Sequence, residues 1–255
     1  MSNNPTPYTD INNILQAFQT SVQDVLGDHF VGMYLHGSLA SGDFDPQRSD
    51  IDFLVVTDGD LSEEIFQKLK KMHERIATSD SKWVKRLEGS YVSRQVLQCT
   101  TPPKKPRPYI NEGRFCLARY GYEWTLELHV LREKGIVLAG QDIKSLIDPV
   151  GSEDIRRAVL KILHEWWVPM LEGSSRLDSN EYQVYGVLTM CRILYALKHG
   201  DIVSKNVAVQ WAKKTLDESL VTLIDRALRW EEGMEFDRLD EVRDFVRYVV
   251  ECAKG

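Results

Sequence analysis

The sequence predicts an α/β half followed by an all-α half. In the first half, short apolar runs bounded by glycine or aspartate alternate with segments of helical periodicity, the pattern of a sheet covered by helices. In the second half every segment has helical periodicity, which is typical of a helical bundle. The turn-rich stretch SLIDPVGSED at 145–154 separates them, so we expect two domains, 1–150 and 151–255.

Apolar spacing places the elements of the first half. A helix is predicted over 10–27, with Asp10 as its N-cap, and a second over 62–77, capped by Ser62. Three short apolar segments are predicted to be strands of a small mixed sheet: 30–37, 50–57 and 87–97.

The next segments are less regular. The stretch TTPPKKPRPYINEG at 100–113 is rich in proline and basic residues, so we expect a loop, either solvated or able to approach phosphates. The stretch 115–140 has an ambiguous start and then helical periodicity up to Gly135. In the second half, helices are predicted at 153–168, 181–199, 204–215, 217–230 and 239–253, with Asn180, Ser204 and Asp217 as N-caps.

Composition excludes several classes of protein. The chain has 255 residues, 43% of them hydrophobic and 27% charged, and no apolar run approaches the roughly 20 residues of a membrane helix. A net charge of −6 without a basic stripe argues against nucleic acid as a partner. Four scattered cysteines and a polar N-terminus without a signal pattern favour reduced thiols. We therefore expect a cytoplasmic monomer that binds neither membrane nor nucleic acid.

Two aspartates at the start of an apolar strand are the first functional signal. Asp50 and Asp52 are two residues apart in DIDFLVV, so their side chains project from one face of the strand. The apolar residues that follow predict a buried strand, where two unpaired carboxylates would cost several kcal/mol. A divalent cation between them would relieve this conflict, and an oxygen-only ligand set favours Mg²⁺.

A Gly-Ser pair before these aspartates is the second signal. Gly37 and Ser38 follow the strand predicted at 30–37, and such a turn lets backbone amides and a hydroxyl approach phosphate oxygens. Arg48 and Ser49 lie beside Asp50 and are also able to reach phosphate. Each signal is weak alone, but their conjunction between two apolar strands is specific.

That conjunction, HGSLASGDFDPQRSDIDFLVV at 36–56, resembles the nucleotidyltransferase superfamily that includes DNA polymerase beta and the antibiotic nucleotidyltransferases. Its pattern is Gly-Ser, about ten residues, Asp-x-Asp, and a third carboxylate on a later strand, for which Glu88 in KRLEGSYVSR is the candidate. The stretch VYGVLTMCRILYALKHGDIVSKNVAVQWAKKTL at 184–216 is similar to the helical domain of the streptomycin/spectinomycin adenylyltransferases. The first half is therefore expected to be a nucleotidyltransferase domain.

The resemblance implies roles for the matching residues. Asp50 and Asp52 would hold Mg²⁺, with two ions expected, and Glu88 would be the general base. The residues expected to bind ATP are Gly37, Ser38 and Ser49 at the phosphates, Arg192 and Lys205 from the helical half, Glu123 near the nucleotide, and Trp230 at the adenine or its sugar.

The acceptor is expected to bind at a loop, residues 166–183, where Trp166 and Asp178 would contact it. Glu88, from the first half of the chain, would contact it as well. The resemblance implies transfer of AMP from ATP to a hydroxyl of an aminoglycoside or aminocyclitol, a small cationic polyhydroxyl compound that suits an acidic cleft. Two alternatives stay open: the same chemistry on a lincosamide, another small alcohol or a protein hydroxyl, and a non-catalytic relative that only binds nucleotide.

Overall fold

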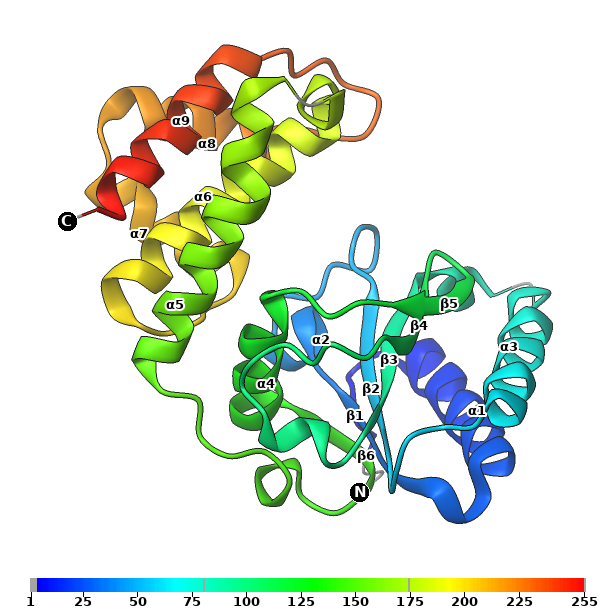
Figure 1. Ribbon diagram of the computed structural model, residues 1–255. Coiled ribbons are helices and arrows are strands. Elements are labelled where there is room, and N and C mark those ends of the chain that lie inside the picture. Colours follow the sequence, from blue (N-terminus) through cyan, green and yellow to red (C-terminus); the bar gives the residue numbers. More distant parts are fainter. Residues whose placement is uncertain (1–3, 80, 174, 255) are drawn as a thin grey trace. The chain divides into compact units, whose positions relative to one another are not determined.

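The computed structural model describes residues 4–79, 81–173 and 175–254. The chain divides into two compact units, Met1–Pro149 and Val150–Gly255 (Figure 1). The first unit contains a mixed sheet with helices on both faces, and the second is helical.

Six strands form the sheet of the first unit, in the spatial order β5-β4-β3-β2-β1-β6. The central neighbours β2 and β3 are parallel, and the other neighbouring pairs are antiparallel. The strands are β1 (Phe30–Leu35), β2 (Ile51–Thr57), β3 (Leu87–Ser93), β4 (Arg107–Asn111), β5 (Arg114–Ala118) and β6 (Ile136–Gly140).

The two faces of this sheet differ in chemistry. Helices α1 (Thr9–Leu26) and α3 (Glu63–Ala77) cover one face (Figure 1). Alternate strand residues such as Ile51, Phe53 and Tyr91 bury their side chains there in the main apolar core. The opposite face lies toward α2 (Gly37–Ser41) and α4 (Glu123–Lys134). The residues between the core positions, which include two carboxylates, therefore project toward α2 and α4.

Three sequence expectations in this unit are wrong. The strand predicted over 87–97 ends at Ser93, and residues 96–98 form a 3₁₀ turn. Residues 107–111 are not a loop but strand β4, which forms a hairpin with β5 through Glu112 and Gly113, both at positive φ (49° and 73°). The sequence RPYIN has a weak strand-like alternation of polar and apolar residues, but its proline and basic neighbours favoured a loop. Pairing with β3 and β5 outweighs this weak local propensity for a strand. The N-cap of α1 is Tyr8 rather than Asp10, and the Asp10 carboxylate instead accepts a hydrogen bond from Trp83 Nε1 at 2.7 Å.

The second unit is built around α6, which contacts the four other helices. These helices are α5 (Ser152–Ile162), α6 (Asn180–His199), α7 (Lys205–Thr215), α8 (Glu218–Arg229) and α9 (Leu239–Cys252). Ser204 caps α7 through the amide of Val207, as expected, but α6 is capped by Ser179 rather than Asn180. The first helix is shorter than predicted, since it passes into a π-helical turn at Leu163–Trp167 and a 3₁₀ turn at Val168–Glu172.

Candidate active site

The two aspartates lie at the start of β2, on the face turned away from the apolar core. Asp52 is the second residue of the strand and Asp50 directly precedes it, while the intervening Ile51 is fully buried in the core. Asp52 pairs with Glu88 in the parallel register of β2 and β3. Since paired residues of neighbouring strands project from the same face, the carboxylates of Asp52 and Glu88 lie side by side.

The Gly-Ser segment packs directly against Asp52. Gly37 has φ +60°, and a Cβ atom added to it would lie 1.8 Å from Asp52 Oδ2. The His36 amide donates a hydrogen bond to the Asp52 carbonyl at 3.1 Å. Ser38 is the second residue of the short helix α2, so the segment is a helical turn rather than a simple loop. This helix is thus held against the aspartate strand.

Two hydrogen bonds close the loop that precedes Asp50. The Asp45 amide donates to Ser49 Oγ at 3.0 Å, and the Ser49 amide donates to the Asp45 carbonyl at 2.8 Å. These two bonds order the loop immediately before the strand, and they place Ser49 next to Asp50.

Glu88 occupies an electrostatically unfavourable position for a carboxylate. It is half-buried, and burial raises its pKa first, followed by the negative charges of Asp52, Asp50 and Glu127. Only the hydrogen bond from the Tyr109 hydroxyl to Glu88 Oε1 opposes this and lowers the pKa. A cation bound beside these carboxylates would offset the same repulsion.

The donor set fits Mg²⁺ on Asp50 and Asp52, which offer oxygen ligands only. Across the described ranges, no group of three or more His, Cys, Asp and Glu side chains stands ready to hold one ion. Asp50 and Asp52 stay the pair that the sequence predicts to hold Mg²⁺.

Sequence reasoning missed three residues of this site: Tyr109, Arg107 and Glu127. Burial raises the pKa of Glu127 most, and Glu123 and Asp52 raise it further, while His36 and Arg107 lower it. The signal for Arg107 and Tyr109 was the alternation of polar and apolar residues in RPYIN, which is typical of a strand. The signal for Glu127 was its spacing of four residues from Glu123, which places both on one helical face. Glu123 itself is the exposed first residue of α4, with its carboxylate against Gly121.

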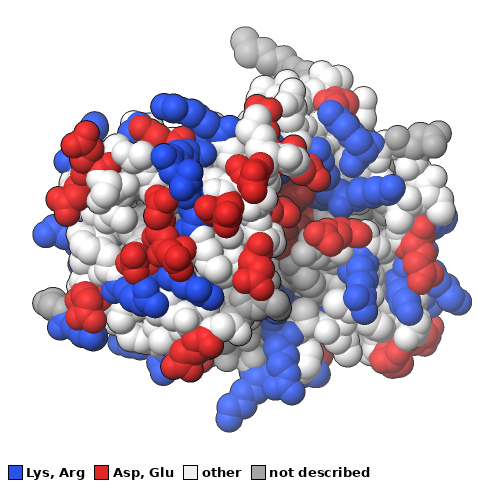
Figure 2. Space-filling view, turned by 90° about the horizontal axis from the view of Figure 1, so that it is seen from above, with Lys and Arg blue, Asp and Glu red and all other residues white. Residues whose placement is uncertain are grey.

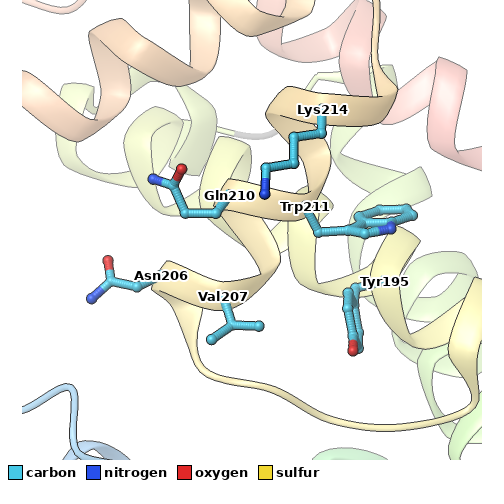
Figure 3. Close-up of a pocket in the computed structure, with 6 residues that line it drawn as sticks. All are labelled: Tyr195, Asn206, Val207, Gln210, Trp211 and Lys214. Atoms are coloured by element: carbon cyan, nitrogen blue, oxygen red, sulfur yellow. The ribbon is translucent and has the colours of Figure 1, made fainter.

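In the helical unit, the residues expected to bind ATP lie on α6, at the start of α7 and after α8. Arg192 is half-buried on α6, and Lys205 is the exposed first residue of α7. Beside Lys205 in sequence, a hollow of about 430 Å³ opens between α6 and α7 (Figure 3). It is lined by Tyr195, Asn206, Val207, Gln210, Trp211 and Lys214.

Trp230 follows the end of α8 and lines a second hollow, of about 220 Å³. Its Nε1 donates a hydrogen bond to the Met234 carbonyl at 2.8 Å, which fixes the indole in place. Three arginines line the same hollow: Arg226, Arg229 and Arg238. Glu235 lines it as well, and Arg226 and Arg238 face the Glu241 carboxylate at 3.9 Å and 3.3 Å.

The two acceptor candidates lie in the segment between α5 and α6. Trp166 is 45% exposed, its Nε1 donates to the Tyr182 hydroxyl at 2.8 Å, and the Arg176 guanidinium lies 4.4 Å from its ring centroid. Asp178 is exposed at the end of the 3₁₀ turn that contains Arg176. The neighbouring Trp167 is only 1% exposed and belongs to the core.

The surface carries charges of both signs. Figure 2 shows acidic and basic side chains interspersed over the face in view. None of the helices among the described residues has the length and apolar character needed to cross a bilayer.

The mixed sheet with adjoining carboxylates on β2 and β3, followed by a helical unit, defines a nucleotidyltransferase. Residues 13–99 match the family model described as "Nucleotidyltransferase domain", and residues 145–254 match "Aminoglycoside adenylyltransferase, C-terminal domain". The spectinomycin 9-adenylyltransferase of Staphylococcus aureus is 30% identical, over 94% of this chain and 93% of its own length. The chain belongs to the family of spectinomycin and aminoglycoside adenylyltransferases.

Two further comparisons agree with this family. The aminoglycoside (3'') (9) adenylyltransferase of Escherichia coli is 28% identical over 86% of each chain. The crystal structure of spectinomycin adenyltransferase AAD(9) from Enterococcus faecialis, with ATP and spectinomycin, superposes with a TM-score of 0.75 at 19% identity. It covers 95% of this chain and 99% of that one, and at this identity the likeness establishes the fold. The expected fold class and enzyme class are thereby confirmed.

Proposed function

We propose that this protein transfers the adenylyl group of ATP to a hydroxyl of an aminocyclitol antibiotic of the spectinomycin or streptomycin type. The observation that carries the proposal is the side-by-side pair Asp52 and Glu88, with Asp50 at the head of the same strand. Spectinomycin is the first choice of acceptor, because the staphylococcal relative is named for it.

In the proposed reaction the acceptor oxygen attacks the α-phosphorus of ATP. A new P–O bond forms, the bond to the β-phosphate breaks, and pyrophosphate leaves. Glu88 takes the proton of the hydroxyl, since a carboxylate beside the candidate metal ligands is placed to accept it. Asp50 and Asp52 would hold Mg²⁺, with two ions expected, and the bound metal would neutralise negative charge on the phosphates.

Other residues are assigned to the nucleotide. Gly37, Ser38 and Ser49 are assigned to the triphosphate, since this segment packs against Asp52 or leads into Asp50. Lys205 and Arg192 are assigned to the phosphates as well. Lys205 stands in the first turn of a helix, where a cation is disfavoured unless an anion is bound nearby.

The remaining assignments rest on position alone. Trp230 is assigned to the adenine or its sugar, because its indole lines a hollow. Glu123 is assigned to the nucleotide because it is exposed and lies one helical turn from Glu127, which faces the site carboxylates. Trp166 and Asp178 are assigned to the acceptor, together with Glu88. An exposed indole and an exposed carboxylate are suited to a cationic ring compound.

The test is an assay of the purified chain with Mg-ATP and a panel of spectinomycin, streptomycin, other aminoglycosides and a lincosamide. We expect pyrophosphate release and a product heavier by one adenylyl group with spectinomycin or streptomycin. The variant D52N should lose this turnover. Its matched control is D58N, which removes an exposed carboxylate just beyond the other end of β2 that pairs with Arg94.

Absence of any adenylylated product with the whole panel would contradict the proposal, and product with the lincosamide alone would replace the acceptor. We also propose a cytoplasmic monomer that binds neither nucleic acid nor membrane. Size-exclusion chromatography coupled to light scattering tests the oligomeric state.

A further inference from the structure

The loop that leads into β2, residues 44–49 and here called the site loop, is closed by bonds among its own residues. Besides the two bonds between Asp45 and Ser49, the Gln47 amide donates to Asp45 Oδ1 at 2.8 Å. The Arg48 amide donates to the Asp45 carbonyl at 3.1 Å. Such bonds fix the shape of the loop, but they do not fix where the loop lies relative to the sheet. Its position has to come from contacts with other segments.

Phe44 makes one such contact at the start of the site loop. Its ring centroid lies 5.1 Å from that of Tyr8 and 5.8 Å from that of Trp83. Trp83 is only 3% exposed, and its indole donates a hydrogen bond to Asp10, so this ring is itself fixed in the first unit. Phe44 therefore anchors the first residue of the loop, six positions before Asp50.

Arg86 makes the second contact, from the segment that leads into β3. Its Nη1 donates to the Pro46 carbonyl at 2.9 Å, and its Nη2 donates to the Gln47 carbonyl at 2.7 Å. Its Cζ atom lies 5.5 Å from the Trp83 ring centroid, and this contact restricts the side chain further. Two hydrogen bonds from one charged, planar donor thus hold the middle of the site loop in one position and orientation.

Arg86 and Asp50 have equivalent places on two neighbouring strands. Arg86 directly precedes the first residue of β3, and Asp50 directly precedes the first residue of β2. Those two first residues pair with each other in the parallel register, and the next pair is Asp52 and Glu88. One side chain thus connects the start of the strand that carries Glu88 to the loop that leads into the strand carrying Asp52.

We propose that Arg86 is a positioning residue, whose two hydrogen bonds to the site loop set the positions of Ser49 and Asp50 for Mg-ATP. Without these bonds the loop keeps its internal bonds and its anchor at Phe44, but its later residues move relative to β3. Arg86 acts through the loop and need not touch the substrate. This inference rests on the proposed function, in which Ser49 and Asp50 bind the triphosphate and its metal.

The first test compares R86M, which keeps the aliphatic stem and removes both donors, with the matched control R132M. Arg132 Nη1 on α4 also donates to two backbone carbonyls of one loop, those of Lys144 and Ile147, at 2.8 and 2.6 Å. Both variants should lower the melting temperature. Only R86M should lower kcat at saturating Mg-ATP, by about 100-fold, because a shift of about 1 Å in the site loop misplaces Asp50. Equal kcat values in the two variants would show that Arg86 is merely structural and would overturn the inference.

A second measurement does not depend on turnover. It is hydrogen exchange of the full chain without metal or nucleotide, followed by mass spectrometry. In R86M the amides of residues 43–50 should exchange about tenfold faster than in the wild type, because the site loop opens more often. In R132M the faster exchange should be confined to residues 142–147. Wild-type exchange of residues 43–50 in R86M overturns the inference even in an active enzyme.

Calorimetric titration with Mg-ATP separates this inference from the proposed acceptor. We expect R86M to bind Mg-ATP about tenfold more weakly than the wild type, and R132M to bind it with wild-type affinity. An unchanged affinity in R86M contradicts the inference. If the wild type adenylylates no acceptor while R86M shows faster loop exchange and weaker Mg-ATP binding, the inference stands and the proposed function is refuted.

The variant R86K completes the design. Its ammonium keeps the charge but lacks the fork that donates to two carbonyls from two nitrogens, so its kcat should lie between those of R86M and the wild type. If R86M does not fold, R86K takes its place, and its loop exchange and Mg-ATP affinity should change in the same direction by less. Wild-type values of both in R86K would then overturn the inference.

Discussion

Position 37 requires glycine, because the carboxylate of Asp52 occupies the space of a side chain there. The chain needs φ +60° there, which L side chains rarely adopt, and a Cβ atom would collide with Asp52 Oδ2. Both requirements come from packing the start of α2 against β2. Gly37 therefore sets how closely the Gly-Ser segment approaches the candidate metal ligand.

G37A should consequently damage the site more than the fold. The added methyl group must displace Asp52, and a shift of about 1 Å there should lower kcat by about 100-fold. The measurement is pyrophosphate release at saturating ATP, alongside thermal unfolding.

G42A is the control, because Gly42 also has positive φ (+81°) but nothing lies within 4 Å of its Cβ position. It should cost about 1 kcal/mol of stability and leave kcat near the wild-type value. Equal losses of kcat in the two variants would show that backbone strain alone explains G37A.

Among the elements, the π-helical turn Leu163–Trp167 has the clearest consequence for function. It interrupts the helix predicted over 153–168, and Pro169, which has no amide hydrogen to donate, lies two residues beyond its end. Trp166 is exposed and Trp167 is buried against Gly186. One short element thus supplies both a core residue and a candidate ligand residue.

The two adjacent tryptophans should respond differently to truncation. W166A should raise KM for the acceptor about tenfold and leave KM for ATP unchanged, because it removes an exposed aromatic surface. W167A should instead lower the free energy of unfolding by about 3–5 kcal/mol, because it opens a cavity. Steady-state kinetics and chemical denaturation separate these effects, and an unchanged acceptor KM in W166A would remove Trp166 from the acceptor site.

At the scale of the whole chain, acid stability should depend on a buried histidine of the first unit. His73 on α3 is 2% exposed, and its Nε2 is 2.8 Å from the Tyr91 hydroxyl. Its ring stacks on Phe115 at 4.8 Å, and Nδ1 has no hydrogen-bond partner within the described part of the chain. Burial lowers the pKa of His73 to about 3, so the folded chain keeps the ring neutral.

The unfolded chain binds a proton at His73 below its ordinary pKa of 6.5, whereas the folded chain does so only near pH 3. The contribution of His73 to stability is therefore complete above pH 6.5 and is lost as the pH falls toward 3. Between pH 7 and pH 5 the loss should be about 2 kcal/mol. Hydrogen exchange of peptides from β2 and β3, followed by mass spectrometry, reports on this unit separately.

H73M should flatten this pH dependence, since methionine fills a similar volume and does not titrate. H164Q, at an exposed histidine of the second unit, should leave it unchanged. A pH dependence in H73M equal to that of the wild type would contradict the assignment to His73.

Local patterns were enough to predict most elements and the chemistry of the reaction. The apolar spacing of α1, α3 and β2 survives in the structure because burial of those faces is what stabilises them. The prediction was wrong at 107–111, where proline and basic composition outweighed a weak alternation. Strand β4 exists because its backbone pairs with β5 across a tight turn and with the more distant strand β3, and local propensity does not report the second pairing.

The residues that indicate the reaction are close to one another in sequence. They are Gly37, Ser38, Asp50 and Asp52, and they lie within sixteen positions. Their spacing along one strand and its preceding loop is enough to indicate metal and phosphate chemistry, because strand geometry fixes where i and i+2 project. The neighbours that shift the pKa of Glu88, in contrast, come from distant parts of the sequence. Tyr109 reaches it through the register of β3 and β4, and Glu127 through the packing of α4 over the sheet. Such contacts arise between distant segments, so tertiary structure alone decides the ionisation of Glu88.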